Sequence, residues 1–196
     1  MTLKRILIVL AILLVTLTGC NKNIPSETDT SAQDTEKEGK ALVVVFSATG
    51  NTRKLGQQIA DVLKADFYEI EPVEPYSQDD LNYGDNNSRT SKERHDDTCR
   101  PEIKSAKITL EDYDTVYLGY PIWHGQAPRI LYTFVEMYDF EGKTIIPFCT
   151  SGSSPIGSSA SNLQKVCTNG NWKEGTRLKN DMSEEEISAW LKQISN

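Results

Sequence analysis

The sequence predicts an α/β domain built on a doubly wound, parallel sheet of five strands. An unbroken apolar run at residues 41–46 has the composition of a strand buried on both faces, which is typical of a parallel sheet. From Leu55 to Leu63 the apolar residues then follow the spacing of a helix. The same order of apolar run, polar loop and helical pattern begins again at residues 115 and 143. Repeated units of this kind are typical of an open sheet with helices on both faces.

The loop between the first strand and its helix is a candidate anion site. Residues 47–52 read Ser-Ala-Thr-Gly-Asn-Thr, with three hydroxyl side chains and a turn at Gly50. The first amides of a helix have no intrahelical partner and lie at the positive end of its dipole, so they attract phosphate. The alternative is that Thr49 or Asn51 only caps the helix. The density of polar groups favours phosphate, and Asn51 is included among the candidate contacts.

The spacing in this loop excludes two common phosphate motifs. A nucleoside triphosphate loop needs Gly-x-x-x-x-Gly-Lys-Ser/Thr, and a dinucleotide loop needs three glycines, whereas Gly50 is followed only by Gly56. A tyrosine-phosphatase loop would need a cysteine in this turn. The loop instead resembles that of the flavodoxin family, Ser/Thr-x-Thr-Gly-x-Thr, and the matching residues are Ser47, Thr49, Gly50 and Thr52. The resemblance implies the strand order 2-1-3-4-5 and a loop that holds the phosphate of FMN without a metal.

A second loop is predicted at the same edge of the sheet. It spans residues 120–126, after a strand at 115–119 and before a helix that starts near Pro128. Ligands of doubly wound sheets bind at the carboxyl ends of the strands. An exposed Trp123 there offers a flat apolar surface to an aromatic ring system, and the alternative is that it packs in the core.

The resemblance extends to this loop. A subgroup of flavodoxin-like proteins carries Tyr/Asn-Pro-Ile-Trp-Trp-Gly here, so Pro121, Ile122, Trp123 and Gly125 match while His124 replaces the second aromatic residue. A histidine titrates near pH 6.5 and can exchange a proton with a flavin or quinone, which makes His124 a weak catalytic candidate. An ordinary surface histidine is the alternative.

A third loop follows the strand predicted at residues 143–149, which we retain although Pro147 removes a ladder donor. Small side chains there let backbone amides approach a planar ligand closely, and a flexible glycine-serine loop is the alternative. The resemblance implies that this loop lines the flavin ring. The candidate contacts are Thr150, Ser151, Gly152 and Ser153.

The rest of the domain is less regular. A second strand is expected at residues 66–71, a short fifth strand at 176–179, and a final helix after a capping box of Ser183 and Glu186. Residues 72–113 form a long polar excursion without a sustained apolar stripe.

Three arginines of this excursion are candidate contacts for an anionic partner. They are free either to meet an anionic partner or to remain solvated. They are Arg89, Arg94 and Arg100.

The amino-terminal residues predict export and lipid attachment. Residues 1–19 combine two basic residues with a 13-residue apolar run, which is typical of a signal peptide and too short for a membrane-spanning helix. The sequence Leu-Thr-Gly-Cys that ends at Cys20 resembles the lipobox of bacterial lipoproteins, which implies cleavage before Cys20 and its acylation. The alternative is an uncleaved signal anchor. Residues 20–40 read as a solvated tether, so the domain at 41–196 is expected outside the cytoplasm, lipid-anchored to the bacterial cell membrane.

Charge, histidine and cysteine content narrow the kinds of partner and metal site that the chain can have. After removal of residues 1–19 the chain keeps 19 basic and 28 acidic residues, a net charge of −9, which disfavours nucleic acid. Two separated histidines and no closely spaced cysteine pair argue against a metal site. Among the cysteines that remain after lipidation, Cys99 with Cys167 is the only pairing we consider.

The resemblance implies FMN-dependent electron transfer, with a redox partner protein or a small-molecule electron donor or acceptor. Two alternatives stay open. One is an FMN-dependent enzyme that reduces a quinone with NAD(P)H, and the other is a non-redox surface lipoprotein that binds a different phosphorylated ligand.

Overall fold

The computed structural model describes residues 39–167 and 169–195. The predicted signal peptide at residues 1–19, the lipidated Cys20 and nearly all of the predicted tether lie outside the described residues. Within the described ranges, every helix is too short or too polar to cross a bilayer.

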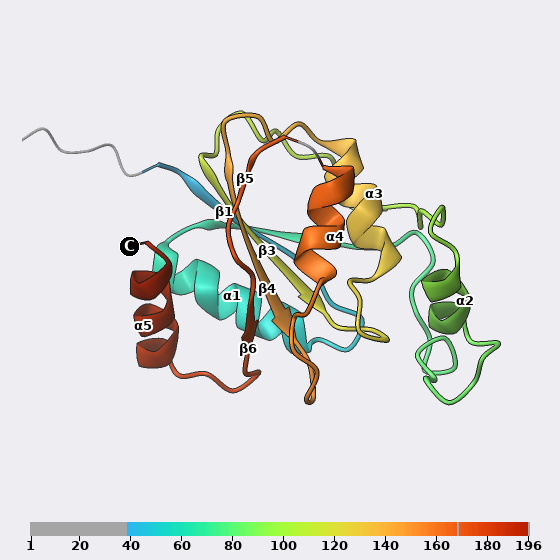
Figure 1. Ribbon diagram of the computed structural model, residues 1–196. Coiled ribbons are helices and arrows are strands. Elements are labelled where there is room, and N and C mark those ends of the chain that lie inside the picture. Colours follow the sequence, from blue (N-terminus) through green and yellow to red (C-terminus); the bar gives the residue numbers. More distant parts are fainter. Residues whose placement is uncertain (1–38, 168, 196) are drawn as a thin grey trace, which may run out of the picture. The chain divides into compact units, whose positions relative to one another are not determined.

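The sheet has the predicted doubly wound order. Its neighbouring strands are all parallel, and they run β2-β1-β3-β4-β5, with β6 also paired to β4 (Figure 1). The five-position order confirms the expected fold class. The strands are β1 (Ala41–Phe46), β2 (Asp66–Ile70), β3 (Thr115–Pro121), β4 (Thr144–Thr150), β5 (Asn171–Trp172) and β6 (Thr176–Leu178).

The fifth position differs from the prediction because two short strands share it. β5 pairs with Thr144 and Ile145, and β6 pairs with β4 again from Phe148 onward. Pro147 lies between these two paired stretches, opposite the gap in the outer ladder. A proline offers no N–H to a neighbouring strand, so the interruption fits its place in an otherwise buried strand.

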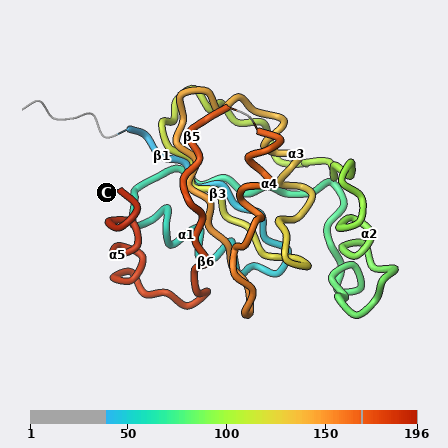
Figure 2. The backbone as a smooth tube through the Cα atoms, viewed as in Figure 1, coloured from blue at the N-terminus to red at the C-terminus, as the bar shows by residue number. Residues whose placement is uncertain are grey.

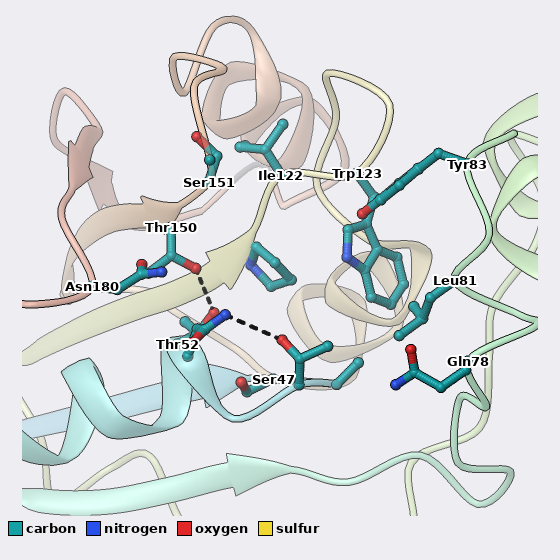
Figure 3. Close-up of a pocket in the computed structure, with 15 residues that line it drawn as sticks. Ser47, Thr52, Gln78, Leu81, Tyr83, Ile122, Trp123, Thr150, Ser151 and Asn180 are labelled. Carbon is teal, nitrogen blue, oxygen red and sulfur yellow. Dashed lines mark hydrogen bonds between the residues drawn. The ribbon is translucent and has the colours of Figure 1, made fainter.

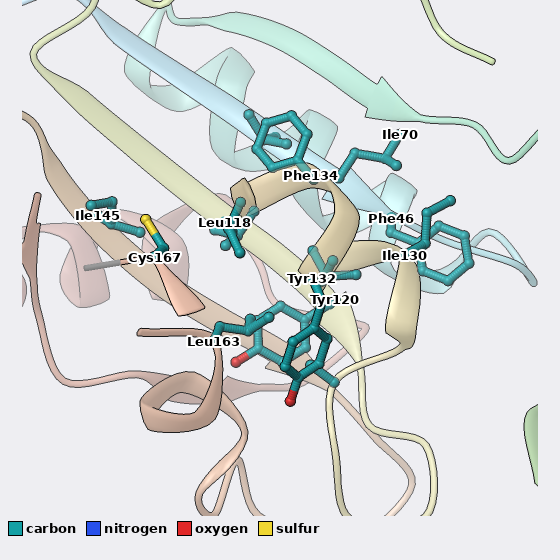
Figure 4. Close-up of a cluster of buried hydrophobic side chains, with 14 of the residues drawn as sticks. Phe46, Ile70, Leu118, Tyr120, Ile130, Tyr132, Phe134, Ile145, Leu163 and Cys167 are labelled. Atoms are coloured by element: carbon teal, nitrogen blue, oxygen red, sulfur yellow. The ribbon is translucent and has the colours of Figure 1, made fainter. Parts of the chain in front are cut away.

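Two layers of helices cover the sheet. In Figure 1, α1 and α5 lie together on one side of the sheet, and α3 and α4 lie together on the other. The strand β1 faces both layers: Val43 and Val45 belong to the core cluster with α1 and α5, while Leu42, Val44 and Phe46 belong to the cluster with α3 and α4. Figure 4 shows part of the second cluster, including Phe46. Each such buried apolar side chain contributes about 1.5–3 kcal/mol. The helices are α1 (Asn51–Leu63), α2 (Arg89–His95), α3 (Arg129–Met137), α4 (Ser159–Val166) and α5 (Glu184–Ile194).

The excursion at residues 72–113 carries the helix α2, which the sequence patterns did not predict (Figure 2). Its helix is short and polar, and tertiary contacts hold it. Arg129 is only 4% exposed, and it donates to the carbonyl oxygens of Glu93 and Arg94 at 3.0 and 3.2 Å. A buried guanidinium thus fastens α2 to the first turn of α3.

The three arginines of the excursion are engaged within the chain. Arg89 pairs with the buried carboxylate of Glu93 at 2.7 Å, and Arg100 pairs with Glu136 at 2.7 Å. Arg94 contacts a ring nitrogen of His124 at 3.2 Å. Each side chain has an intramolecular partner, but Arg94 is exposed, so the solvated alternative stays open for it.

The cysteine pairing that we considered is not formed. Cys99, Cys149 and Cys167 are all free thiols. Cys149 is fully buried in β4, and this burial raises the pKa of its thiol to about 12. A thiol with so high a pKa is a poor nucleophile at neutral pH.

The predicted capping box begins α5. Ser183 accepts a hydrogen bond from the Glu186 amide at 3.2 Å, and the Glu186 carboxylate accepts one from the Ser183 amide at 2.8 Å. Replacing Ser183 by alanine should lower the free energy of unfolding by about 1 kcal/mol, because the cap contact to the Glu186 amide is lost. Urea denaturation measures this loss.

The matched control for this variant is Ser188→Ala, in the middle of the same helix. It removes the same hydroxyl from a position that has no capping role, so its stability should stay within about 0.5 kcal/mol of wild type. Equal losses for the two variants would show that the capping contact contributes nothing.

Candidate functional site

The three predicted loops meet at the carboxyl edge of the sheet and enclose a pocket of about 350 Å³ (Figure 3). Ten of the fourteen predicted site residues line it. These are Ser47, Thr49, Asn51, Thr52, Pro121, Ile122, Trp123, Thr150, Ser151 and Gly152.

The first loop presents unused backbone donors. Gly50 has a φ of +88°, a left-handed conformation that turns the chain directly into α1. The first intrahelical hydrogen bond runs from the Lys54 amide to the Gly50 carbonyl at 3.0 Å. The amides of residues 51–53 therefore have no partner within the helix. An anion at this end of α1 would meet these amides and the positive end of the helix dipole.

The capping alternative for this loop is wrong. Among the described residues, no side chain caps the N-terminus of α1. The side-chain amide of Asn51 instead donates to the Thr49 hydroxyl at 3.4 Å, within the loop itself. The hydroxyl of Thr49 and the backbone donors both remain available at the pocket.

A buried pair of hydroxyls joins the first loop to the third. The Oγ1 atoms of Thr52 and Thr150 are 2.8 Å apart, and the two residues are 1% and 3% exposed. Thr150 is the last residue of β4 rather than the first residue of a loop. This contact fixes the start of α1 against the end of β4, so two walls of the pocket are held by the sheet.

The second loop is shorter than predicted because β3 continues to Pro121. Tyr120, expected in the loop, is fully buried in the strand, and its hydroxyl lies 3.1 Å from Ser159 Oγ. The turn that follows is closed by two hydrogen bonds of 2.9 Å between the backbones of Trp123 and Gln126.

Trp123 is buried, whereas the sequence predicted that it would be exposed. It lines the pocket, yet it is only 7% exposed and packs edge-on against Phe46 and Tyr76, with ring centroids 5.4 and 4.9 Å apart. Both readings of this residue thus hold in part: it is a packed aromatic side chain, and one edge of it reaches the pocket.

The third loop is held by a cation from the neighbouring strand. Arg177 of β6 donates to the Ser151 hydroxyl at 3.0 Å and to the carbonyl oxygens of Ser151 and Gly152 at 3.2 and 3.1 Å. The Ser151 hydroxyl in turn donates to the Ser154 carbonyl. The alternative of a flexible glycine-serine loop does not describe Ser151 and Gly152, because Arg177 binds their backbone to the sheet.

Four predicted site residues do not line the pocket: Gly50, His124, Gly125 and Ser153. Gly50 turns the chain into α1 through its left-handed backbone conformation. His124 and Gly125 occupy the tip of the second turn, with φ values of +48° and +78°, and the His124 ring contacts the excursion instead. His124 thus lies outside the lining of this pocket, and its catalytic role stays a prediction.

Five lining residues were missed by the sequence reasoning. Ala48 sits inside the first predicted loop, and Asn180 follows β6 at the same edge of the sheet. Gln78, Leu81 and Tyr83 come from the excursion, on the side of the pocket opposite Asn180 in Figure 3. Asn180 could have been found from its place after a strand, whereas nothing in the polar pattern of the excursion marked the other three.

The pocket is polar but carries no formal charge. None of the described residues that line it is an acid, lysine, arginine or histidine. The Asn180 Oδ1 atom is buried and has no hydrogen-bond partner among the described residues. A buried acceptor without a partner is costly, so this atom is suited to a donor on a ligand. The site can thus hold an anionic group on amides and hydroxyls and a polar ring beside it.

Comparison with known families and structures agrees with this geometry. Residues 40–194 match the family model described as flavodoxin. A crystal structure from Bacteroides eggerthii, provisionally named a flavoprotein, is 45% identical, with a TM-score of 0.76 over 81% of this chain and 99% of that one. A second from Bacteroides uniformis, with the same provisional name, is 44% identical, with a TM-score of 0.75 over 79% of this chain and 98% of that one.

A more distant match concerns the fold alone. The structure of a flavoprotein in complex with FMN from Lactobacillus acidophilus is 20% identical, with a TM-score of 0.57 over 78% of this chain and 99% of that one. A search of curated proteins found no match.

Proposed function

The chain belongs to the flavodoxin family, and we propose that it binds FMN in this pocket and transfers electrons at the outer face of a bacterial membrane. The observation that carries the proposal is the coincidence of unused helix amides, hydroxyl side chains and a neutral, polar pocket at one edge of the sheet. When bound, FMN supplies the redox chemistry by accepting and releasing electrons.

The residues of the pocket fit such a cofactor. The amides at the start of α1, with the hydroxyls of Ser47 and Thr49, would hold the phosphate. Ile122 and the edge of Trp123 supply apolar surface, and the Ser151–Gly152 backbone and Asn180 supply polar contacts for a heterocyclic ring. In this account the chain binds, orients and partly shields the cofactor.

The neutral lining has a consequence for redox behaviour. The chain carries a net charge of −7, and none of the described residues that line the pocket is a cation; Arg177, which is not a lining residue, already binds the carbonyl oxygens of Ser151 and Gly152. An acidic protein without such a cation disfavours added electrons. We therefore expect a low reduction potential relative to free FMN.

Membrane attachment is the part of the proposal that rests on the sequence. Its support is the basic and apolar run before the Leu-Thr-Gly-Cys sequence that ends at Cys20. Metabolic labelling with a palmitate analogue, compared between wild type and Cys20→Ser, tests it. Label on the wild type alone supports the anchor, and equal labelling of both chains would contradict it.

The visible spectrum tests cofactor binding. After the chain is mixed with FMN and desalted, it should keep flavin absorbance near one equivalent, and dithionite should bleach that absorbance reversibly. A colourless protein after desalting would contradict the proposal and favour the non-redox alternative.

A second candidate function has one observation in its favour. The excursion adds Gln78, Leu81 and Tyr83 to the pocket, and such a wall could contact a second small molecule as well as the cofactor. This arrangement suits an FMN-dependent reductase of quinones that uses NAD(P)H. Steady oxidation of NADH or NADPH by the FMN-loaded chain with a soluble quinone would favour the reductase. Reduction only by a protein donor would favour the carrier.

A further inference from the structure

The excursion reaches the pocket through the aromatic side chain of Tyr83, which also contacts the ring of His124. Tyr83 lines the pocket although it is 53% exposed, and its ring meets the His124 ring edge-on, with centroids 4.8 Å apart. The exposed aromatic side chain thus has two neighbours: the pocket on one side and an imidazole on the other.

His124 is itself fixed by its turn and by α2. Its φ of +48° is uncommon for a residue with a side chain. Arg94 Nη1 lies 3.2 Å from His124 Nδ1, and a guanidinium can only donate, so Nδ1 accepts and the proton of the neutral ring is on Nε2. The Nε2 atom is buried without a partner among the described residues.

The helix that carries Arg94 is in turn anchored. The buried Arg129 binds the carbonyl oxygens of Glu93 and Arg94, and the Thr90 amide and hydroxyl donate to the Asp80 carbonyl at 3.1 and 2.8 Å. These bonds connect α2 both to α3 and to the segment that carries Tyr83. The excursion therefore meets the pocket as a fastened wall.

We infer that His124 is a positioning residue that holds Tyr83 against the bound cofactor, and that protonation of His124 releases the Tyr83 ring from its place at this wall, whose base stays anchored, and weakens binding. The inference rests on the proposed function, because it assigns the wall to an FMN site. A proton on Nδ1 would remove the acceptor of the Arg94 contact and place two cations side by side.

The charges around His124 set the direction of the effect. Arg94 and His95 face it from α2, and Arg129 lies nearby on α3. Glu93 lines the same small cavity, but its carboxylate is occupied by Tyr76 and Arg89. Partial burial, with the charges of Arg94 and His95, lowers the pKa of His124.

The sign of the pH dependence follows. A histidine whose pKa is lowered in the docked arrangement binds fewer protons there than when it is released. The arrangement with Tyr83 held at the pocket is therefore fully stable above the ordinary histidine pKa of about 6.5. It loses stability as pH falls below that value. The loss is complete once pH is below the lowered pKa.

The experiment measures dissociation constants for FMN by fluorescence quenching at pH 7.5 and 5.5. Tyr83→Ala should raise the constant about threefold to tenfold at pH 7.5, the range that one aromatic contact contributes. Val73→Ala is the matched control, because Val73 is 48% exposed on the same excursion but does not line the pocket. It should bind as wild type.

Comparing FMN affinity at the two pH values distinguishes a positioning role of the titrating His124 ring from a packing contact that does not depend on pH. His124→Phe keeps a ring edge beside Tyr83 but can neither titrate nor accept a hydrogen bond from Arg94, so at pH 7.5 it should bind FMN about threefold more weakly than wild type. The FMN phosphate titrates equally in both chains. Between pH 7.5 and 5.5, wild type should lose about threefold more affinity than His124→Phe, a modest factor because the Arg94 contact is partly solvated. His95→Gln should keep most of the wild-type dependence.

A readout without FMN completes the test. In the cofactor-free chain, the His124 ring should titrate below 6.5 by NMR, and Arg94→Gln should raise that pKa. Identical pH dependence in wild type and His124→Phe, or wild-type affinity in Tyr83→Ala, would overturn the inference and leave the proposed function standing. A wild-type chain that binds no FMN would overturn both.

Discussion

Replacing Thr49 by aspartate should weaken FMN binding about 100-fold and change riboflavin binding by less than about threefold. Thr49 is exposed at the loop where we place the phosphate, and a carboxylate there would repel a dianion at close range. Riboflavin lacks the phosphate, so the repulsion should not affect it. Fluorescence titration with the two ligands measures the difference.

The control for this prediction is Thr49→Asn, which has nearly the same size as the aspartate variant and no charge. It should bind FMN within about fivefold of wild type. Unfolding would not explain a loss in the aspartate variant, because a negative charge near the N-terminus of α1 favours the helix. Equal weakening of FMN and riboflavin would show that the phosphate does not lie at this loop.

Replacing Gly119 by alanine should destabilise the fold by about 3 kcal/mol. Gly119 lies in β3, paired with Phe148 of β4, and a Cβ atom built on it would fall 2.2 Å from Cζ of that phenylalanine ring. The ring is fully buried, so it cannot move aside without displacing the core. Urea denaturation with a fitted m-value gives the change in the free energy of unfolding.

A double variant isolates this clash. Phe148→Leu removes the ring atoms that would be struck, so Gly119→Ala with Phe148→Leu should be more stable than Gly119→Ala alone. Gly84→Ala is the matched control in a loop, where the new methyl group would meet only an Asn82 side-chain oxygen at 3.3 Å. If both alanine variants were equally stable, the close packing of β3 on β4 would not be rigid.

The layered fold could be predicted because its signals are local. The apolar run at 41–46 and the change to helical spacing after Gly50 both follow from the burial of β1 on two faces and of α1 on one. The predicted ends of the strands were less accurate, because β3 continues to Pro121 and β4 continues to Thr150. These residues look like loop residues by type, but pairing with each other continues the ladder.

The wall of the pocket from the excursion could not be predicted. Its position depends on single long-range contacts, such as Arg129 with the α2 carbonyl oxygens and Tyr76 with Glu93, and no periodic pattern marks them. The interior role of Trp123 was hidden for the same reason, because Tyr76 covers it from the excursion. Local sequence placed the three loops correctly, and long-range polar contacts decided how the site is closed.

A crystal structure of the chain soaked with FMN tests the central proposal most directly. We expect the phosphate within hydrogen-bonding distance of the amides that begin α1 and the ring between the Ile122–Trp123 segment and the Ser151–Gly152 segment. Density for FMN elsewhere, a reversed orientation with the phosphate away from residues 47–52, or a pocket without FMN at saturating concentration would contradict it.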